Sequence, residues 1–354
     1  MSNLSDGALI AILVVGGIAT WVAGLFLSKA TDVIDEHFNL GEALGGMILL
    51  GVAGTLPEIA ITVSAALTGA LGLAVGNLLG GIAMQTLVLV IIDLANRNKR
   101  PLSYLSRAME PMHEAALVVG VVAIAMMGIL LPESDAIGPA SPASIMIVVV
   151  WFLGMWGIAR SRKNVRWNAV DAGADVSKAA SAADEAPAPS KPNRMADRPI
   201  GVVIAIFGAA SVATLVAGVV LEQSGNQLAN NKGINGVIFG ATVLALITAL
   251  PEISTGIAAA RMGQVGLAMG DIFGGNSIQI TLFLVADIIA GKPVLPTASA
   301  QSAWLAGLGI LVTAIYMNGL MTRPPKKVLG LVGPDSLLVL VAYVLGVVGL
   351  SHVA

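Results

Sequence analysis

The chain has 354 residues, of which 56% are hydrophobic and only 11% are charged, and its formal net charge is −2. Soluble proteins average about 25% charged residues, so this composition excludes an ordinary soluble enzyme and a disordered chain. The near-neutral charge provides no basic excess for binding nucleic acid. The chain has no cysteine and only 3 histidines, which excludes disulfides and thiolate metal sites. Any bound cation must therefore be held by oxygen atoms.

Ten apolar segments are each about long enough to cross a bilayer, which takes roughly 20 residues in a helix. In chain order, the predicted spans are 8–28, 41–69, 73–92, 115–131, 142–159, 199–221, 233–260, 265–289, 302–318 and 336–353. The first span has no basic region before it and no small-residue cleavage site after it, so we interpret it as a retained span rather than a signal peptide. The predicted fold class is an all-α polytopic membrane protein.

The polar segment 161–198 is rich in Ala, Ser, Pro and charged residues and cannot bury a core. It predicts a flexible linker between two five-span halves, 1–160 and 199–354. Of the 19 Lys and Arg residues, 17 lie in this linker and in alternate loops. Because positive charge is retained on the cytoplasmic side, the linker is predicted to be cytoplasmic and both termini outside. We expect a multi-pass protein of a plasma (inner) membrane.

An internal repeat relates the two halves. Residues 56–93 align with 250–287 without a gap, and 15 of the 38 positions are identical, where composition alone gives about three. The surrounding repeat units span about 41–95 and 233–290. Because each half has an odd number of predicted spans, the second copy must enter the membrane from the opposite side. The prediction is therefore ten transmembrane helices as two inverted five-helix repeats, a plan typical of secondary transporters with a midplane site.

Each copy of the repeat carries one proline–glutamate pair, which ends with Glu58 or Glu252. A carboxylate near the bilayer centre is costly, so it usually faces protein or a water-filled cavity on an ion pathway. The proline cannot donate to the carbonyl four residues earlier, and broken backbone at that depth must line a cavity. Each copy thus offers a freed carbonyl and a nearby hydroxyl. These groups belong to Ala53 and Thr55 in the first copy and to Ile247 and Thr248 in the second.

Two glutamines, Gln85 and Gln279, follow Gly81 and Gly275 by one helical turn. Glutamine offers a neutral carbonyl oxygen, and glycine lets a neighbouring helix approach closely. Since Ca²⁺ takes six to eight oxygen ligands, we hypothesise one cage with the glutamates as anionic metal ligands. The glutamines, threonine hydroxyls and freed carbonyls would complete it. Two alternatives remain. The glutamines could form hydrogen bonds between helices without binding the cation, and the glycines could serve helix packing alone.

Further polar residues occupy the same segments. Asn77 and Asp271 are equivalent positions that either cap helices or line the cation entrance. Asp93 and Asp287 end the repeated segments and are expected at the membrane interface. The polar group before the fourth span is expected to form a solvated helix start, with a regulatory cation site as the alternative. Its residues are Glu110, His113 and Glu114.

The repeated motifs resemble those of a known family. The segments GTLPE at 54–58 and GNLLGG at 76–81 recur as TALPE at 248–252 and GDIFGG at 270–275. They resemble the two α-repeats of the cation/Ca²⁺ antiporter superfamily, and its sodium/calcium exchanger branch is the most similar. The resemblance implies that the second, third, seventh and eighth of ten helices enclose the cation site. It also implies that import of Na⁺ or H⁺ drives export of Ca²⁺.

The resemblance assigns the paired family glutamates to Glu58 and Glu252 and the hydroxyl residues before them to Thr55 and Thr248. This chain departs from the family pattern at three pairs of positions. Gly54 and Ala249 replace hydroxyl residues, Gly81 and Gly275 replace serines, and Gln85 and Gln279 replace Asn or Asp. Several hydroxyl ligands typical of sodium sites are therefore absent. Two glutamates alone could support proton exchange, because a divalent cation competes with protons for them.

The predicted function is a secondary antiporter that exchanges Ca²⁺, or a similar divalent cation, for Na⁺ or H⁺ by alternating access. A divalent-cation channel is the alternative, although no filter loop is evident and two buried carboxylates would hold the ion tightly. Mn²⁺ or Mg²⁺ as substrate stays open. An intramembrane enzyme lacks the expected nucleophile and histidine motifs. We expect no cofactor, and only the lipid bilayer and small cations as partners, with no obligatory protein partner.

Overall fold

The computed structural model describes residues 4–38, 51–96, 98–106, 109–162 and 195–353. In these ranges the secondary structure is helical, apart from two isolated β-bridges in loops. The first half contains α1 (Asp6–Phe38), α3 (Leu56–Thr68), α4 (Leu71–Ala95), α5 (Leu102–Leu105), α6 (Glu110–Ile129) and α7 (Pro142–Arg162). The second half contains α9 (Ile200–Lys232), α10 (Gly236–Phe239), the π-helix η3 (Gly240–Leu244), α11 (Ala245–Thr248), α12 (Leu250–Arg261), α13 (Val265–Gln279), α14 (Leu282–Ala290), α15 (Ala300–Thr322) and α16 (Pro334–Leu350).

Within the described ranges, 7 helices are long and apolar enough to cross a membrane, and the bent pair Gly236–Thr248 and Leu250–Arg261 gives an eighth span. The shorter apolar helices α3 and α16 lie at the second and tenth predicted spans. The prediction of an all-α polytopic membrane protein is confirmed. Positions 41–50 of the second span and 163–194 of the predicted linker lie outside the described residues. The division into two halves at that linker therefore stays a prediction.

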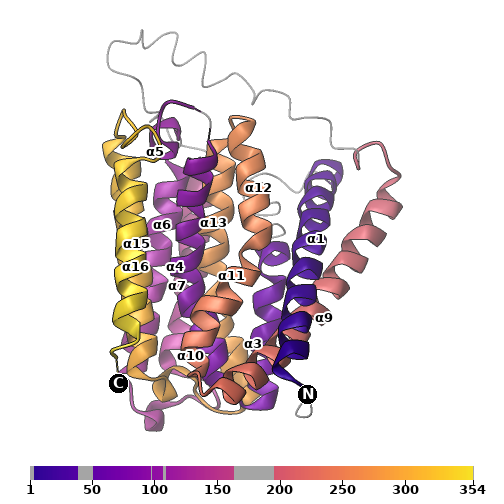
Figure 1. Ribbon diagram of the computed structural model, residues 1–354, viewed down its shortest axis with the longest axis vertical. Coiled ribbons are helices and arrows are strands. Elements are labelled where there is room, and N and C mark those ends of the chain that lie inside the picture. Colours follow the sequence, from indigo (N-terminus) through magenta and orange to yellow (C-terminus); the bar gives the residue numbers. More distant parts are fainter. Residues whose placement is uncertain (1–3, 39–50, 97, 107–108, 163–194, 354) are drawn as a thin grey trace.

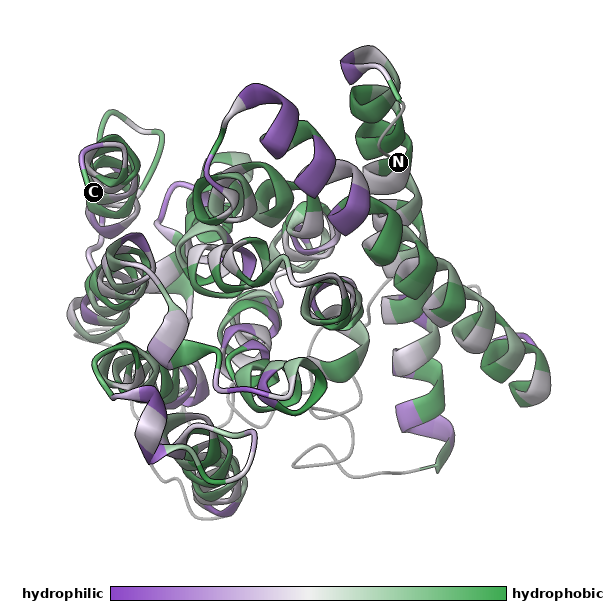
Figure 2. Ribbon diagram, turned by 90° about the horizontal axis from the view of Figure 1, so that it is seen from below, coloured by the Kyte–Doolittle hydropathy of each residue, from purple (hydrophilic) through white to green (hydrophobic). Residues whose placement is uncertain are grey.

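The helices stand side by side in one bundle, with α1 and α9 as a pair along one edge (Figure 1). The two chain termini lie at the same end of the bundle, here called the terminal end, and α5 lies at the opposite end, the α5 end. Apolar residues cover the outward faces of the helices (Figure 2). Large apolar side chains such as Val15, Leu153 and Leu345 are 66%, 61% and 65% exposed. This exposure suits contact with lipid rather than with water.

Polar side chains are instead concentrated inside the bundle, around α4. This helix has apolar residues on every side, and 78% of the residues in its most apolar stretch are buried. It contacts α3, α12, α13, α15 and α16. A helix that is hydrophobic all round belongs in the centre of a bundle. The buried polar residues on α4 include Asn77, Gln85 and Asp93. The central helix thus carries the polar groups of the first repeat into the core.

The edge pair α1 and α9 extends the internal repeat. Residues 7–27 align with 201–221 at the same offset of 194 positions, and 10 of these 21 positions are identical. The two helices are antiparallel, because Asp6 at the start of α1 forms a 2.8 Å ion pair with Lys232 at the end of α9. The match was not among the sequence predictions. It makes α1 and α9 equivalent members of the two copies.

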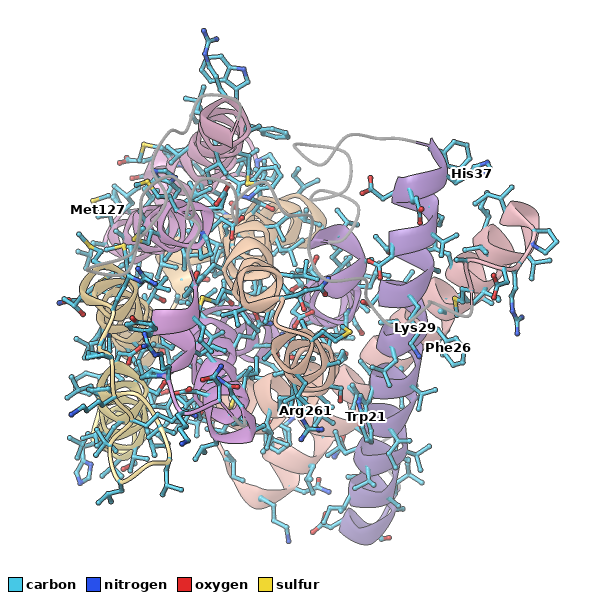
Figure 3. All side chains as sticks on the ribbon, turned by 90° about the horizontal axis from the view of Figure 1, so that it is seen from above. Trp21, Phe26, Lys29, His37, Met127 and Arg261 are labelled. Atoms are coloured by element: carbon cyan, nitrogen blue, oxygen red, sulfur yellow. The ribbon has the colours of Figure 1, made fainter. Side chains whose placement is uncertain are left out.

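Glycines on α1 and α9 bring both helices against the two prolines of the repeat. A Cβ atom placed on Gly24 would lie 2.7 Å from the Cβ of Pro251, and one on Gly218 would lie 3.0 Å from the carbonyl oxygen of Pro57. Only glycine allows so close an approach. Near the first crossing, Nε1 of Trp21 donates to Oγ of Ser254 at 2.6 Å (Figure 3). The edge pair therefore crosses the site-bearing helices at equivalent points.

Asp93 and Asp287 connect the two halves crosswise. Asp93 accepts hydrogen bonds from the N–H of Gly333 at 2.6 Å and from Oγ of Ser336 at 3.0 Å, at the start of α16. Asp287 accepts from the N–H of Ser141 at 2.9 Å, directly before α7. Each aspartate thus holds the last long helix of the other half. Both lie at helix ends, as predicted, but both are fully buried by these partners instead of facing the membrane interface.

Candidate cation site between the repeats

Proline places each repeat glutamate at a helix start. Pro57 and Pro251 occupy the first turns of α3 and α12, so Glu58 and Glu252 also lie in first turns. Proline suits this position because its missing N–H has no partner there in any helix, and the positive end of the helix dipole favours a carboxylate. In the second copy, the π-helix η3 and α11 precede a bend of 44° into α12. A broken helix therefore presents each glutamate.

The two glutamate side chains are buried close together. Glu58 is 1% exposed and Glu252 is 7% exposed, and Pro57, the residue before Glu58, lines the same pocket as Glu252. One oxygen of each carboxylate, Oε2, has no hydrogen-bond partner within the described residues. Two buried carboxylates with unused oxygens form a site that a cation would neutralise.

Gln85 and Gln279 meet beside Glu58. Nε2 of Gln85 donates to Oε1 of Glu58 at 3.4 Å and to Oε1 of Gln279 at 3.3 Å. Nε2 of Gln279 donates to the carbonyl oxygen of Leu78 at 2.8 Å. The two glutamines thus connect equivalent points of the two copies. In this state both bond to protein, and the structure brings them to the glutamates as the cage hypothesis requires.

The predicted hydroxyl and carbonyl groups differ between the copies. Oγ1 of Thr248 donates to the carbonyl of Ala245 at 3.3 Å within its own copy and lies near the Glu58 carboxylate of the opposite copy, whereas Oγ1 of Thr55 donates to the carbonyl of Gly51 at 2.9 Å within its own copy. The N–H of Ala249 donates to the carbonyl of Ala245 at 3.1 Å, and the role of the Ile247 carbonyl as a cation ligand stays a prediction. Ala53 lines the pocket described below.

The glycine pair is not symmetric either. A Cβ atom on Gly81 would lie 2.5 Å from Nε2 of Gln279, whereas a Cβ on Gly275 meets nothing within 4 Å. Gly81 therefore makes room for the glutamine of the other copy, which favours a packing role for it. At Gly275, the equivalent residue of the second copy, no side chain of a described residue occupies the corresponding position.

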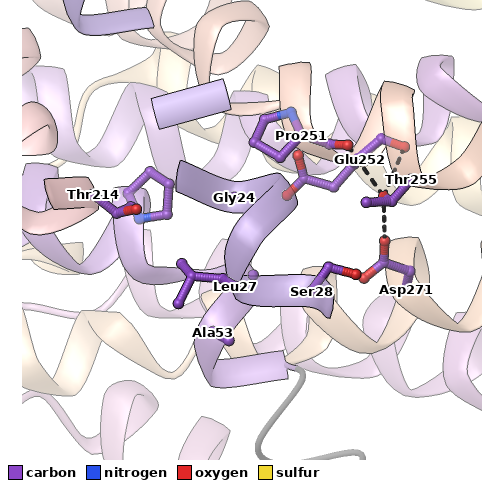
Figure 4. Close-up of a pocket in the computed structure, with 11 residues that line it drawn as sticks. Gly24, Leu27, Ser28, Ala53, Thr214, Pro251, Glu252, Thr255 and Asp271 are labelled. Carbon is purple, nitrogen blue, oxygen red and sulfur yellow. Dashed lines mark hydrogen bonds between the residues drawn. The ribbon is translucent and has the colours of Figure 1, made fainter. Parts of the chain in front are cut away.

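Among the described residues, a pocket adjoins Glu252 on the side of the α5 end. Eleven residues line it, including Ser28 of α1, Thr255 of α12 and Asp271 of α13 (Figure 4). Oγ1 of Thr255 donates to Oδ2 of Asp271 at 3.1 Å. Asp271 thus lines the approach to Glu252, which favours the entrance alternative over helix capping. Its counterpart Asn77 is 1% exposed, and its amide has no hydrogen-bond partner in the described ranges.

Carboxylates continue from this pocket along α1. Asp271 is close enough to interact electrostatically with Glu252 on one side and with Asp32 on the other, and Asp32 interacts in turn with Asp35. A row of carboxylates raises the local concentration of cations. It leads from the buried pair toward the α5 end.

The approach from the terminal end is closed in this structure. Ile61, the residue equivalent to Thr255, is fully buried in an apolar cluster of α1, α3, α4, α9 and the second broken helix. The other members are Leu9, Leu13, Leu73, Leu221, Leu228, Ala229, Phe239 and Leu244. Next to Leu221 of this cluster, Glu222 of α9 accepts a hydrogen bond from Oγ of Ser64 in α3. Glu222 was not among the site residues predicted from the sequence. The predicted sixth span ended at residue 221, so Glu222 did not count as a charge within an apolar segment.

The polar group before the fourth span does not form a site. Glu114 is 2% exposed and lies against Gly270, so it differs from the solvated residue that the sequence suggested. Glu110 and His113 are half-buried. In the described part of the chain, no group of three or more His, Cys, Asp or Glu residues is placed to hold a metal ion. The regulatory cation site before the fourth span stays a prediction.

Sequence comparison finds relatives along most of the chain. The model of the sodium/calcium exchanger protein family matches residues 8–157 and 201–351. Inner membrane protein YrbG of Escherichia coli strain K12 is 27% identical over 291 residues, which cover 81% of this chain and 79% of YrbG. The putative antiporter CaxA of Alkalimonas amylolytica is 26% identical over 307 residues, which cover 85% of this chain and 87% of CaxA.

Solved structures share the fold. The H⁺/Ca²⁺ exchanger CAX matches with a TM-score of 0.67 and 16% identity, over 97% of this chain and 82% of that chain. The sodium-calcium exchanger NCX_Mj matches with a TM-score of 0.57 and 15% identity, over 97% of this chain and 99% of that chain. The family model itself covers both repeats and both edge helices. The chain therefore belongs to the sodium/calcium exchanger protein family.

Proposed function

We propose that this protein is a secondary antiporter that binds Ca²⁺, or a similar divalent cation, between Glu58 and Glu252 and exchanges it for Na⁺ or H⁺. The observation that carries the proposal is the pair of buried carboxylates from opposite repeats, of which Glu58 is joined through Gln85 to Gln279 of the second copy. Hard cations such as Ca²⁺ prefer carboxylate and carbonyl oxygens. CAX and NCX_Mj, which share the fold, are described as H⁺/Ca²⁺ and sodium-calcium exchangers.

Charge neutralisation gives a physical reason for exchange. Two ionised carboxylates buried together are costly in a medium of low dielectric constant. One divalent cation offsets both charges, and so do two monovalent cations or two protons. The change between the two access states therefore costs less free energy when the site holds cations or protons than when its two carboxylates are empty and charged. Exchange of one divalent cation for monovalent cations follows from this balance.

The proposed motion shifts the edge pair α1 and α9 against the site helices. Gly24 and Gly218 form the equivalent crossing points at the two prolines. In this state the pocket adjoins Glu252 on the side of the α5 end, and the apolar cluster around Ile61 closes the terminal end. The closed end argues against a channel, which needs a continuous path. Movement about the crossings would expose the site at one end and then at the other.

The orientation in the membrane is also part of the proposal. Lys29 lies in the second half of α1, Arg261 ends α12, and Arg323 follows α15 and bonds the carbonyl of Tyr104 in α5, so all three lie toward the α5 end. Under the positive-inside rule, the α5 end faces the cytoplasm and the two termini lie outside. The described pocket would then be open to the cytoplasm of a cell whose plasma (inner) membrane holds the protein.

Flux measurements test the function directly. Purified protein in proteoliposomes is given ⁴⁵Ca²⁺ under an imposed Na⁺ gradient in one set and a proton gradient in another. Uptake driven by one gradient identifies the coupling ion, and uptake with neither gradient would support a channel. If Ca²⁺ gives no flux, the same assay with Mn²⁺ and Mg²⁺ tests the alternative substrates, and no flux of any divalent cation would overturn the proposal.

Two variants test the carboxylate pair. Glu58→Gln and Glu252→Gln should each abolish divalent flux while the protein stays folded, because one carboxylate cannot neutralise a divalent cation. Glu133→Gln is the matched control, since Glu133 lies exposed in a short 3₁₀ turn between α6 and α7. Normal Ca²⁺ flux in either site variant would remove Glu58 or Glu252 from the site.

A further inference from the structure

Glu222 is a buried carboxylate that the proposed cation site does not use. It lies on the edge helix α9 and is fully buried. Oγ of Ser64 donates to its Oε2 at 2.6 Å, and Oγ1 of Thr68 donates to its Oε1 at 3.2 Å. Both hydroxyls belong to α3, which also carries Glu58. These bonds join the edge pair to a site helix.

Glu222 lies between the proposed cation site and the terminal end of the bundle, which is closed in this structure. It follows the crossing glycine Gly218 by about one turn of α9, in the direction of Lys232 and the terminal end. The buried Leu221 beside it belongs to the apolar cluster that contains Ile61. Any opening from the terminal end must separate α9 from α3 at this point.

The equivalent position in the other copy behaves differently. Ser28 of α1 corresponds to Glu222 at the repeat offset of 194 positions. Ser28 lines the pocket beside Glu252, together with Thr255 of α12. The donors also have no counterparts, because Ala258 and Met262 replace Ser64 and Thr68. The carboxylate and its two donors thus occur together in one copy, at the closed end.

We propose that Glu222, Ser64 and Thr68 form a latch that holds the terminal end of the transport path closed. A hydrogen bond to a carboxylate is shorter and stronger than one between neutral groups. A carboxylate within the membrane stays buried only while it is paired. Separation of α9 from α3 breaks both bonds and must let water or a cation reach Glu222. The latch therefore biases the protein toward the state open at the α5 end. The inference rests on alternating access in the proposed function.

Cysteine reporters measure this bias, because the chain has no cysteine of its own. Ile61→Cys reports opening at the terminal end, and Ser28→Cys reports opening at the α5 end. Each reporter protein is first checked for Ca²⁺ flux and then labelled with a membrane-impermeant thiol reagent from each side. In the otherwise unmodified protein, we expect rapid labelling at Ser28→Cys and slow labelling at Ile61→Cys.

Latch variants should reverse this pattern. Ser64→Ala with Thr68→Val removes both donors and leaves an unpaired buried carboxylate, so labelling of Ile61→Cys should rise on the order of tenfold or more. Labelling of Ser28→Cys should fall. Glu222→Leu removes the charge as well and should give a smaller rise, because no unpaired carboxylate remains. Ser211→Ala is the matched control, since that α9 hydroxyl bonds only its own helix, at the Phe207 carbonyl.

The outcomes separate the latch from the transport proposal. Unchanged labelling of both reporters in the folded donor variant would overturn the latch. A larger effect of Glu222→Leu than of the donor variant would do the same, because it would indicate a packing role for the side chain. Labelling does not require transport, so a missing Ca²⁺ flux in the unmodified protein would count against the proposed function alone.

Discussion

Gln85 donates a hydrogen bond to Gln279, the residue that holds the same position in the other repeat, with 3.3 Å between Nε2 and Oε1. The two side chains therefore meet where the copies meet. Gln85 uses the same amide group to reach Glu58 at 3.4 Å. One neutral side chain thus links a carboxylate of the first copy to the second copy. Changes at this pair should affect cation binding directly.

Replacement of Gln279 by Asp should tighten divalent binding, because it adds a third carboxylate to the two glutamates. The shorter side chain also loses the bond to the Leu78 carbonyl. Gln279→Asn is therefore the control, since it shortens the side chain without adding charge. Isothermal titration with Ca²⁺ should give tighter binding for Gln279→Asp than for Gln279→Asn. Equal affinities would show that residue 279 does not face the ion.

Acidification should weaken Ca²⁺ binding. A carboxylate must lose its proton before it binds the cation, so each proton that Ca²⁺ displaces makes the affinity fall by up to about tenfold per unit of pH. Binding isotherms between about pH 5 and pH 8 measure this slope. The slope should be shallower in Glu252→Gln, which has one titrating ligand fewer, and unchanged in Glu133→Gln. A pH-independent affinity in the unmodified protein would contradict binding at the glutamates.

The crossing glycines should not tolerate a side chain. Gly24→Ala places a Cβ atom 2.7 Å from Pro251, and Gly218→Ala places one 2.5 Å from the Cβ of Ala60. Overpacking of this kind typically costs about 1–3 kcal/mol, and here it also obstructs movement of the edge pair. We expect slower Ca²⁺ flux and a lower Tm. Gly7→Ala, at a glycine with nothing within 4 Å of an added Cβ, is the control; a similar loss of flux there would contradict the steric explanation.

Asp93→Asn should destabilise the protein more than Asp287→Asn. Both changes weaken hydrogen bonds to a charged acceptor, which are worth about 1.5–3 kcal/mol each. Asp93 also pairs with Lys327 at 3.4 Å, and the two side chains are 0% and 3% exposed. Asp93→Asn therefore leaves an unpaired buried cation. Thermal unfolding in detergent should show the larger loss for Asp93→Asn and partial recovery when Lys327→Met is added. Equal losses would contradict a role for the ion pair.

The sequence singled out the candidate site residues because they recur. Glu58 and Glu252 stand out as charges within apolar segments, and Gln85 and Gln279 recur at the same offset. The structure buries all four side chains and joins Glu58, Gln85 and Gln279 by hydrogen bonds. Periodicity and composition also sufficed for the fold class, because every apolar segment of the required length had to become a helix.

Features that occur once, or whose partners lie far apart in the sequence, were not predictable. Glu222 has Ser28 as its counterpart, so the repeat gave no signal for it. The burial of Asp93 depends on Gly333 and Ser336, about 240 residues later, which no local pattern indicates. Tertiary contacts decided each of these points.

The crosswise bonds of Asp93 and Asp287 bear on how the protein is assembled during synthesis. While the first half emerges from the ribosome, the start of α7 lacks the carboxylate that will hold it, because Asp287 has not yet been made. Asp93 likewise cannot form its bond to Gly333 until the start of α16 has been made, and α16 is among the last segments to enter the membrane. Each aspartate has one partner in its own half, the N–H of Leu102 for Asp93 and the N–H of Val294 for Asp287, and needs the other half for the rest. A protein truncated before α16 would therefore leave Asp93 without the bond from Ser336.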